Sequence, residues 1–316
     1  MNIIEFGDCR DIMKKWAANN VKAQTCVTSP PYFGLRDYGH DGQIGLEATP
    51  DEYIRNMVEV FRCVWDVLSD DGTLWLNIGD SYASYRDGKA TPDTSRGTDT
   101  GTLVPKGSAR NRMASTFQGS SIKHKDLIGI PWMLAFALRA DGWYLRQDII
   151  WHKPNPMPES VQDRCTKAHE YMFLFSKSEK YFFDNASIKE PVSFNSIKRL
   201  TQSNLSNQIG SNRVPNKTNG NMKAVGNIEN RNKRSVWSVA TKPYKGAHFA
   251  VYPPELIEPC ILAGSRIGDI VLDPFMGSGT TAQVAMQNNR QYLGCELNES
   301  YKILQKNRLN QNHLNL

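Results

Sequence analysis

Short apolar runs, each bounded by glycine, proline or polar residues, recur along the chain. Their length and their flanking turn residues are typical of buried β-strands. The runs cover residues 24–28, 73–78, 145–151, 171–176, 270–272 and 291–295. The sequence therefore predicts a strand in each of these runs.

Amphipathic segments with the helical period lie between these strands. In residues 50–68 one face is apolar and consists of Tyr53, Met57, Val60, Phe61, Val64 and Leu68. Residues 127–140, 254–263 and 280–288 show similar patterns. Strands that alternate with helices predict an α/β fold with a doubly wound, mainly parallel sheet. Ligands of such sheets bind beyond the carboxyl ends of the strands, so we expect the chemistry in the loops that follow them.

The composition allows a sizeable core and excludes a membrane span. Of the 316 residues 40% are hydrophobic and 22% are charged, and no uncharged apolar run approaches roughly twenty residues. The first residues lack the basic patch and apolar stretch of a secretory signal, which predicts a soluble, cytoplasmic protein with no membrane partner. The six cysteines are scattered without C-x-x-C spacing, so we expect neither a disulfide framework nor a metal site.

Two long stretches concentrate positive charge. Residues 84–125 carry eight basic and three acidic side chains, and residues 195–234 carry eight basic and one acidic. Loops this long are uncommon in compact domains unless they are functional or disordered. Solvated insertions are one interpretation, and a surface that contacts nucleic acid is the other. The candidate DNA-binding residues are Arg110, Arg112, Lys198, Arg199, Arg213, Lys217, Arg231, Lys233 and Arg234.

A glycine-rich loop follows the predicted strand 270–272. It reads Asp273-Pro274-Phe275-Met276-Gly277-Ser278-Gly279-Thr280-Thr281 and leads into a predicted helix, whose N-terminus favours a negative group. The loop has neither the lysine of a phosphate-binding P-loop nor the third glycine of a dinucleotide fingerprint. Glu296 ends the next strand, where a carboxylate can accept hydrogen bonds from ribose hydroxyls.

A second loop, Ser29-Pro30-Pro31-Tyr32, follows the predicted strand 24–28. The prolines fix an extended backbone and leave carbonyl oxygens as acceptors. The Ser29 hydroxyl and the Tyr32 ring add an acceptor and a stacking surface, which suit a planar base with an exocyclic amine.

The two loops together resemble those of the DNA amino-methyltransferases, and their order along the chain resembles the permuted β class of that family. The resemblance implies S-adenosyl-methionine as cofactor and a Rossmann-like fold. It assigns the catalytic loop to Ser29, Pro30, Pro31 and Tyr32. The cofactor residues it implies are Asp8, His248, Phe249, Asp273, Phe275, Gly277, Ser278, Gly279, Thr280, Thr281 and Glu296.

The resemblance also implies a domain organisation. Residues 1–83, 126–190 and 236–316 would form a circularly permuted catalytic domain, residues 84–125 a basic flexible insertion, and residues 191–235 a basic target-recognition insertion. Double-stranded DNA is the expected partner, with the target base flipped out of the helix onto Tyr32. A homodimer and a cognate restriction endonuclease are further candidate partners.

Several alternatives stay open. Family members with Ser at the first position of the Pro-Pro-Tyr loop more often modify cytosine N4, so Ser29 favours that target, with adenine N6 as the alternative. A dinucleotide-dependent oxidoreductase would share the fold and Glu296, but it gives no reason for residues 29–32. A non-catalytic nucleic-acid binding module would explain the basic stretches and leave the glycine loop without a function.

Overall fold

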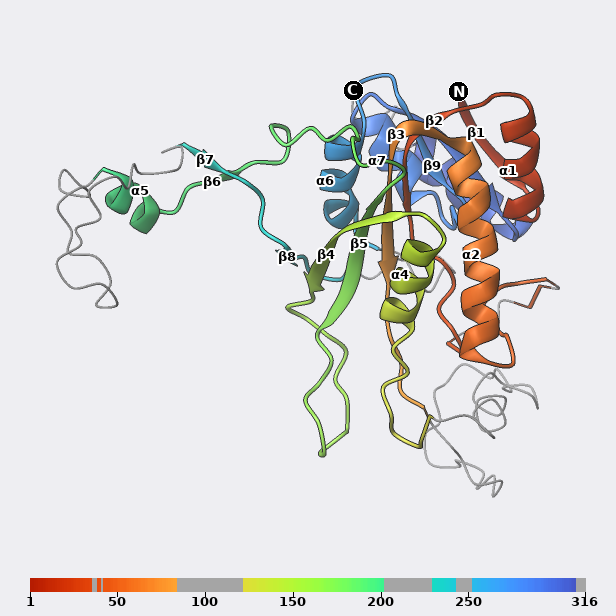
Figure 1. The fold of residues 1–316 in the computed structure, drawn as a ribbon, viewed down its shortest axis with the longest axis horizontal. Coiled ribbons are helices and arrows are strands. Elements are labelled where there is room, and N and C mark those ends of the chain that lie inside the picture. Colours follow the sequence, from red (N-terminus) through yellow and green to blue (C-terminus); the bar gives the residue numbers. More distant parts are fainter. Residues whose placement is uncertain (36–38, 41, 84–121, 202–228, 243–251, 311–316) are drawn as a thin grey trace. The chain divides into compact units, whose positions relative to one another are not determined.

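The computed structural model describes residues 1–35, 39, 40, 42–83, 122–201, 229–242 and 252–310 (Figure 1). The chain divides into two compact units. The first unit consists of Met1–Phe183 and Ser235–Leu316, and the second of Asp184–Arg234.

An eight-stranded sheet forms the centre of the first unit among the described residues. Its strands are β1 Asn2–Phe6, β2 Ala23–Thr28, β3 Leu68–Ile78, β4 Tyr144–His152, β5 His169–Ser176, β8 Val236–Ser238, β9 Ile270–Asp273 and β10 Gln291–Glu296. Their order in the sheet is β1-β10-β9-β2-β3-β5-β4-β8. Every neighbouring pair is parallel except those of β5, which runs antiparallel to β3 and β4. The predicted mainly parallel sheet is confirmed.

Helices cover both faces of this sheet. They are α1 Cys9–Ala18, α2 Pro50–Val67, α4 Ile130–Ala140, α6 Pro254–Gly264, α7 Thr280–Gln287 and α8 Lys302–Asn310. Helices α1, α2 and α4 pack side by side in one layer, while α6 and α7 form the other, with α8 against α7 (Figure 1). This arrangement is the doubly wound α/β fold.

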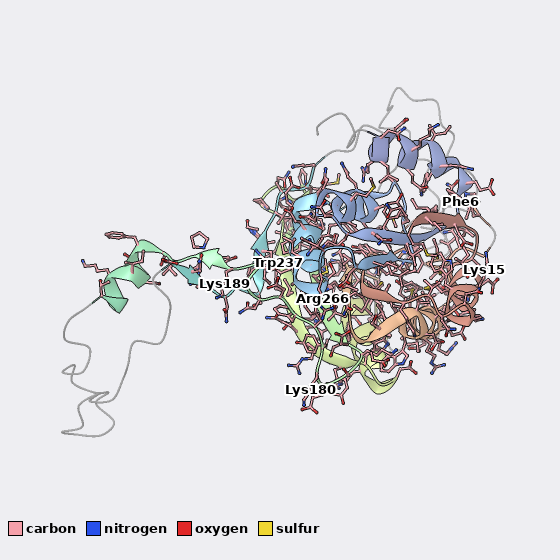
Figure 2. The ribbon with its side chains drawn as sticks, turned by 90° about the horizontal axis from the view of Figure 1, so that it is seen from above. Phe6, Lys15, Lys180, Lys189, Trp237 and Arg266 are labelled. Atoms are coloured by element: carbon pink, nitrogen blue, oxygen red, sulfur yellow. The ribbon has the colours of Figure 1, made fainter. Side chains whose placement is uncertain are left out.

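The predicted helical face of residues 50–68 forms the core contact of α2, except for Leu68, which has an extended backbone and begins β3. Tyr53, Met57, Val60, Phe61 and Val64 are fully buried there. The helix begins where the Thr49 hydroxyl accepts a hydrogen bond from the Glu52 amide, with proline in the first turn. Figure 2 shows side chains filling the space between the layers of this unit, with charged residues such as Lys15 and Lys180 at its surface.

The predicted helix 127–140 begins later, at Ile130. Gly129 precedes it with φ = 89°, a left-handed conformation that favours glycine. The Asp80 carboxylate accepts hydrogen bonds from the Gly129 and Ile130 amides and so caps the helix from the end of β3. The start of α4 is therefore fixed by a residue distant in sequence.

The topology gathers several loops at one edge of the sheet. Because β1, β2, β3, β4, β9 and β10 run in the same direction, their carboxyl ends lie along one edge. The antiparallel β5 starts at this edge with His169 and Glu170. The loops that carry the candidate chemistry therefore converge there.

The second unit contains a short antiparallel pair, β6 Glu190–Pro191 with β7 Asn230–Arg231, and helix α5 Phe194–Leu200. Within it the Glu190 carboxylate accepts ion pairs from Arg231 at 3.4 Å and Lys233 at 3.3 Å. None of the helices that the structure describes combines the length and apolar character needed to cross a membrane.

Candidate active site

A cavity of about 1000 Å³ opens at the carboxyl edge of the sheet, within the first unit. Both loops singled out in the sequence line it, although they stand more than 240 positions apart in the chain. The predicted residues on its wall are Asp8, Ser29, Pro30, Pro31, Tyr32, Phe275, Gly277, Ser278, Thr280 and Glu296. His248 and Phe249 lie outside the described residues.

The glycine loop presents polar groups to the cavity at the start of α7. Gly277 and Gly279 have φ values of 54° and 88°, so both turns need a conformation that side chains other than glycine rarely adopt. The Ser278 hydroxyl is buried, lines the cavity and has no hydrogen-bond partner among the described residues. A buried hydroxyl without a partner is costly, and an anionic group at this helix N-terminus would satisfy it. The loop thus fits the carboxylate end of S-adenosyl-methionine.

Three of the predicted cofactor residues, Asp273, Gly279 and Thr281, do not line this cavity. Asp273 is 1% exposed, and its carboxylate accepts hydrogen bonds from the hydroxyls of Thr28 at 2.6 Å and Thr281 at 2.5 Å and from the Phe275 amide at 3.0 Å. Burial raises the pKa of the Asp273 carboxyl, and these hydrogen bonds oppose that rise. The hydrogen bonds of Asp273 with Thr281 and with Thr28 of β2 therefore connect the glycine loop to that strand.

Glu296 is the last residue of β10 and contacts the glycine loop. Its carboxylate accepts hydrogen bonds from the Gly277 amide at 2.7 Å and the Asn298 amide at 2.8 Å. Burial raises the pKa of this carboxyl. Each oxygen keeps a second lone pair, so Glu296 can hold the loop and still accept hydrogen bonds from a ribose.

Asp8 caps α1 at the end of β1. Its Oδ1 accepts a hydrogen bond from the Arg10 amide at 2.8 Å, and its Oδ2 pairs with Arg10 Nη2 at 2.6 Å. This guanidinium lowers the pKa of the Asp8 carboxyl, which therefore stays ionised at neutral pH. The structure places Asp8 on the cavity wall, with Arg10 fixing its orientation.

Helix α8 holds the glycine loop from outside, a role that the sequence did not reveal. Gln305 Nε2 donates to the Gly277 carbonyl at 2.7 Å, and the Arg308 guanidinium contacts the Thr280 hydroxyl. Both side chains are buried, so the inner face of this helix is polar. Tyr252, also missed, lines the cavity and donates to Asp273 at 3.1 Å.

The second loop, residues 29–32, is braced by tyrosines. The Tyr53 hydroxyl of α2 donates to the Pro31 carbonyl at 2.9 Å. The Tyr32 hydroxyl donates to Glu170 Oε2 at 2.7 Å and lies 3.3 Å from Asn77 Oδ1. Burial and the neighbouring Glu170 raise the pKa of the Tyr32 phenol well above its usual value, so the phenol remains a donor.

Glu170 is the centre of a network that the sequence analysis did not assign. Besides Tyr32, its carboxylate accepts from Asn77 Nδ2 at 3.3 Å and forms an ion pair with Lys153. These residues come from the β2 loop, β3, β5 and the end of β4. A Cβ at Gly79 would stand 2.7 Å from the Tyr32 ring, so the ring is packed tightly against the backbone after β3. The orientation of Tyr32 is therefore fixed on several sides.

Two basic residues add to the same wall. Lys167 and His169 both line the cavity, and burial lowers the pKa of each. The lowered pKa favours the neutral imidazole of His169 at physiological pH. The carboxylates of Asp80, Glu170 and Glu159 lie near enough to Lys167 to raise its pKa and so oppose the effect of burial.

The predicted DNA-binding residues are only partly described. Lys198, Arg231, Lys233 and Arg234 belong to the second unit, where Arg231 and Lys233 pair with Glu190. Arg110, Arg112, Arg213, Lys217 and the side chain of Arg199 lie outside the described residues. No group of three or more histidine, cysteine or acidic side chains in the described part of the chain is arranged to hold a metal ion.

Comparison with known proteins defines the class. A family model described as DNA methylase matches residues 23–307. The chain is similar to the Type II methyltransferase M.SmaI of Serratia marcescens, with 48% identity over 90% of this chain and 82% of the relative. It is also similar to the Type II methyltransferase M.XycI of Xanthomonas campestris pv. cyanopsidis, with 45% identity over 96% and 86% of the two chains.

A solved structure confirms the fold. The M1.HpyAVI–SAM complex superposes with a TM-score of 0.57 at 18% identity, covering 98% of this chain and 100% of that one. The chain belongs to the DNA methylase family. It is a DNA methyltransferase of the class that modifies exocyclic amino groups, with the Rossmann-like methyltransferase fold, and S-adenosyl-methionine is its methyl donor.

Proposed function

We propose that this enzyme methylates the exocyclic N4 of cytosine at a fixed sequence in double-stranded DNA. The observation that carries the proposal is the convergence of two loops on one cavity. Ser29 and Tyr32 line this cavity together with residues of the glycine loop and Glu296. A methyl donor and a flipped base would meet between them.

The cofactor would be held by groups that the fold already orients. The Ser278 hydroxyl and the N-terminus of α7 would bind its carboxylate, and Glu296 would accept hydrogen bonds from its ribose. Asp8 would face its adenine, with His248 and Phe249 enclosing it as the family resemblance suggests. S-adenosyl-methionine, when bound, supplies a methyl group activated by a positively charged sulfur.

The loop at residues 29–32 would orient the target amine. Ser29 Oγ and the Pro30 carbonyl would accept hydrogen bonds from the two amine hydrogens, which favours a pyramidal nitrogen with its lone pair free for attack. The Tyr32 ring would stack on the flipped base. Catalysis would then rest on positioning and electrostatics rather than on a covalent intermediate.

Ser29 supports cytosine over adenine. A neutral hydroxyl both accepts and donates hydrogen bonds, whereas a carboxylate at this position only accepts. Ser29 could therefore accept a hydrogen bond from the target amine and direct its own hydrogen to a neighbouring acceptor. The DNA duplex is the substrate in this proposal, and the Type II designation of the relatives suggests a cognate restriction endonuclease beside it.

Sequencing of DNA treated with the purified enzyme tests the target atom directly. The expected product is N4-methylcytosine at one recurring sequence, and N6-methyladenine without N4-methylcytosine would overturn the choice of base. Ser29→Ala should lose most of its turnover and keep its affinity for S-adenosyl-methionine, measured by calorimetry. Wild-type turnover in Ser29→Ala would place the catalytic loop elsewhere.

A further inference from the structure

A base that leaves the helix leaves a gap in the stack. Closing that gap with an apolar side chain offsets part of the energy of unstacking. Such a side chain has to be exposed, rigidly mounted and adjacent to the cavity that receives the base. The connection between β4 and β5, residues 153–168, extends beyond the carboxyl edge of the sheet (Figure 1) and borders the cavity.

Met157 stands in this connection. Its side chain is 86% exposed, the highest value among the large apolar residues exposed in the described part of the chain, and it lines the same cavity as Ser29 and Tyr32. An exposed methionine at a cavity mouth has no packing role in the fold. Its flexible, polarizable side chain adapts well to a flat aromatic surface.

The backbone around Met157 is constrained. Pro156 and Pro158 flank it and restrict the backbone on both sides. One residue earlier, Asn155 Nδ2 donates to the Thr241 carbonyl at 3.0 Å, and the Thr241 amide donates to Asn155 Oδ1 at 2.9 Å. This reciprocal pair anchors the start of the connection to the chain after β8. Met157 is thus presented from a fixed base.

The surroundings of Met157 suit a polyanion. Lys167, at the end of the same connection, lines the cavity, while the nearby Glu170 and Glu159 form their ion pairs with Lys153 and Arg164. A cation beside an apolar side chain is the combination expected where a protein contacts both phosphates and bases.

We propose that Met157 inserts into the DNA stack at the position vacated by the target base. The inference rests on the proposed function, because it assumes that a base is flipped into this cavity. Leu35 is the other exposed apolar residue on the cavity wall, but it is only 51% exposed and has no flanking prolines. Met157, and not Leu35, is therefore the residue that inserts.

The test compares two synthetic duplexes that contain the methylation site found by sequencing. In one the target base is normally paired, and in the other it lies opposite an abasic position, so that flipping breaks no base pair. The enzymes are wild type, Met157→Ala, Leu35→Ala and the control Val161→Ala. Val161 belongs to the same connection but does not line the cavity.

Met157→Ala should lose about tenfold in kcat/KM on the paired duplex and less than about threefold on the abasic one, since flipping is then less costly. Affinity for S-adenosyl-methionine should not change, and Val161→Ala should match wild type on both duplexes. Equal losses of Met157→Ala on the two duplexes, no loss on either, or the selective loss in Leu35→Ala instead would each overturn the proposal. If wild type methylates neither duplex, the proposed function itself fails.

Discussion

At the scale of single residues, the most informative contact is the one between Tyr32 and Glu170. A stacking ring contributes to catalysis only if its plane is fixed before the base arrives. The hydrogen bond of 2.7 Å from the Tyr32 hydroxyl to Glu170, and the close packing of the ring on Gly79, provide this fixation. Glu170 is itself held by Lys153 and Asn77. We therefore propose that Glu170 is a positioning residue that acts through Tyr32.

A double-mutant cycle tests this assignment. Tyr32→Phe keeps the ring but removes the hydrogen bond to a charged acceptor, which is worth about 1.5–3 kcal/mol, so we expect kcat to fall roughly tenfold or more. Glu170→Gln should also lower kcat. Adding Glu170→Gln to Tyr32→Phe should then reduce kcat by less than about twofold, because the two residues act through one contact.

Cofactor affinity separates this role from a general loss of structure. All three variants should bind S-adenosyl-methionine as wild type does, since neither Tyr32 nor Glu170 is among the residues proposed to hold the cofactor. Glu159→Gln is the matched control, because Glu159 also lines the cavity and pairs with Arg164, outside the Glu170 network. Independent, multiplying losses in kcat would show that Glu170 does not act through Tyr32.

A second prediction concerns pH and the Asp8–Arg10 pair. The pKa of Asp8 is lower in the folded protein than its ordinary value of 3.8, so this pair contributes stability that is present above that value and lost as pH falls through the folded pKa. Both side chains are about one third exposed, which limits the contribution to about 1 kcal/mol.

Asp8→Asn should therefore lower Tm by about 2 °C near neutral pH, because asparagine preserves the helix cap but not the ion pair. The difference from wild type should shrink as the pH is lowered below 3.8, measured by thermal unfolding from pH 7 to pH 3. Asp11→Asn, an exposed acid in the first turn of the same helix, is the control. A difference that grows on acidification would contradict the prediction.

Individual residues were predictable from the sequence where a short motif carried them. Ser29 and Tyr32 belong to one short segment of the sequence and Ser278 to another, and both segments line the cavity. Glu170 and Gln305 were missed because their roles depend on side chains far away in the sequence. For Asp273 the motif predicts a cofactor contact, which stays a prediction, and the structure adds buried hydrogen bonds from Thr28 and Thr281 that the motif did not indicate.

At the scale of elements, helix α8 supports the glycine loop. Gly277 is flanked by two polar contacts, from Glu296 on one side and Gln305 on the other. The loop conformation therefore depends on a helix that follows the cofactor strands in the chain. Weakening the contact between Gln305 and Gly277 should therefore lower the affinity for S-adenosyl-methionine.

Gln305→Ala should lower the affinity for S-adenosyl-methionine about two- to tenfold, the range expected for one hydrogen bond of about 0.5–1.5 kcal/mol. The matched control is Lys306→Ala, an exposed neighbour on the same helix. Calorimetry should show the loss in Gln305→Ala alone, with both variants folded by circular dichroism. Equal affinities would mean that the loop keeps its shape without α8.

The pattern of elements shows why some were predictable and others were not. The predicted strands and helices have apolar periodicity, and each is present within a few residues of its expected ends. Helix α8 has no apolar face, because its buried side chains include Gln305 and Arg308. The reversed direction of β5 could not be predicted, since alternation and length do not encode strand direction. The family resemblance indicated the end of a strand at Phe6, which is where β1 ends, but helix α1 was not assigned, although Ile12, Met13 and Trp16 form a buried helical face.

At the scale of the whole molecule, the net positive charge and the cavity belong to different units. The second unit, Asp184–Arg234, has nine basic and three acidic residues, so its formal charge of +6 equals that of the entire chain. The first unit is therefore neutral overall and contains every residue of the cavity wall. We propose that the second unit supplies much of the electrostatic affinity for DNA and the recognition of its sequence.

The last prediction removes the second unit. The rings of Phe183 and Trp237 both pack against the Trp75 ring, with distances between ring centroids of 6.2 Å and 6.5 Å. The chain therefore leaves the first unit and returns to it near the same side chain. A short Gly-Ser linker can thus replace Asp184–Arg234. The shortened enzyme should bind S-adenosyl-methionine within about twofold of wild type, because its cavity is intact. Its DNA affinity should be much lower, and the dependence of that affinity on salt should weaken by about one unit of slope for each lost phosphate contact. Fluorescence anisotropy over a range of salt concentrations measures this slope.

A full-length control with Gln at the eight basic positions from Lys198 to Arg234 should show a similar change. An unchanged slope in both proteins, with cofactor binding intact, would show that the second unit does not contact DNA phosphates.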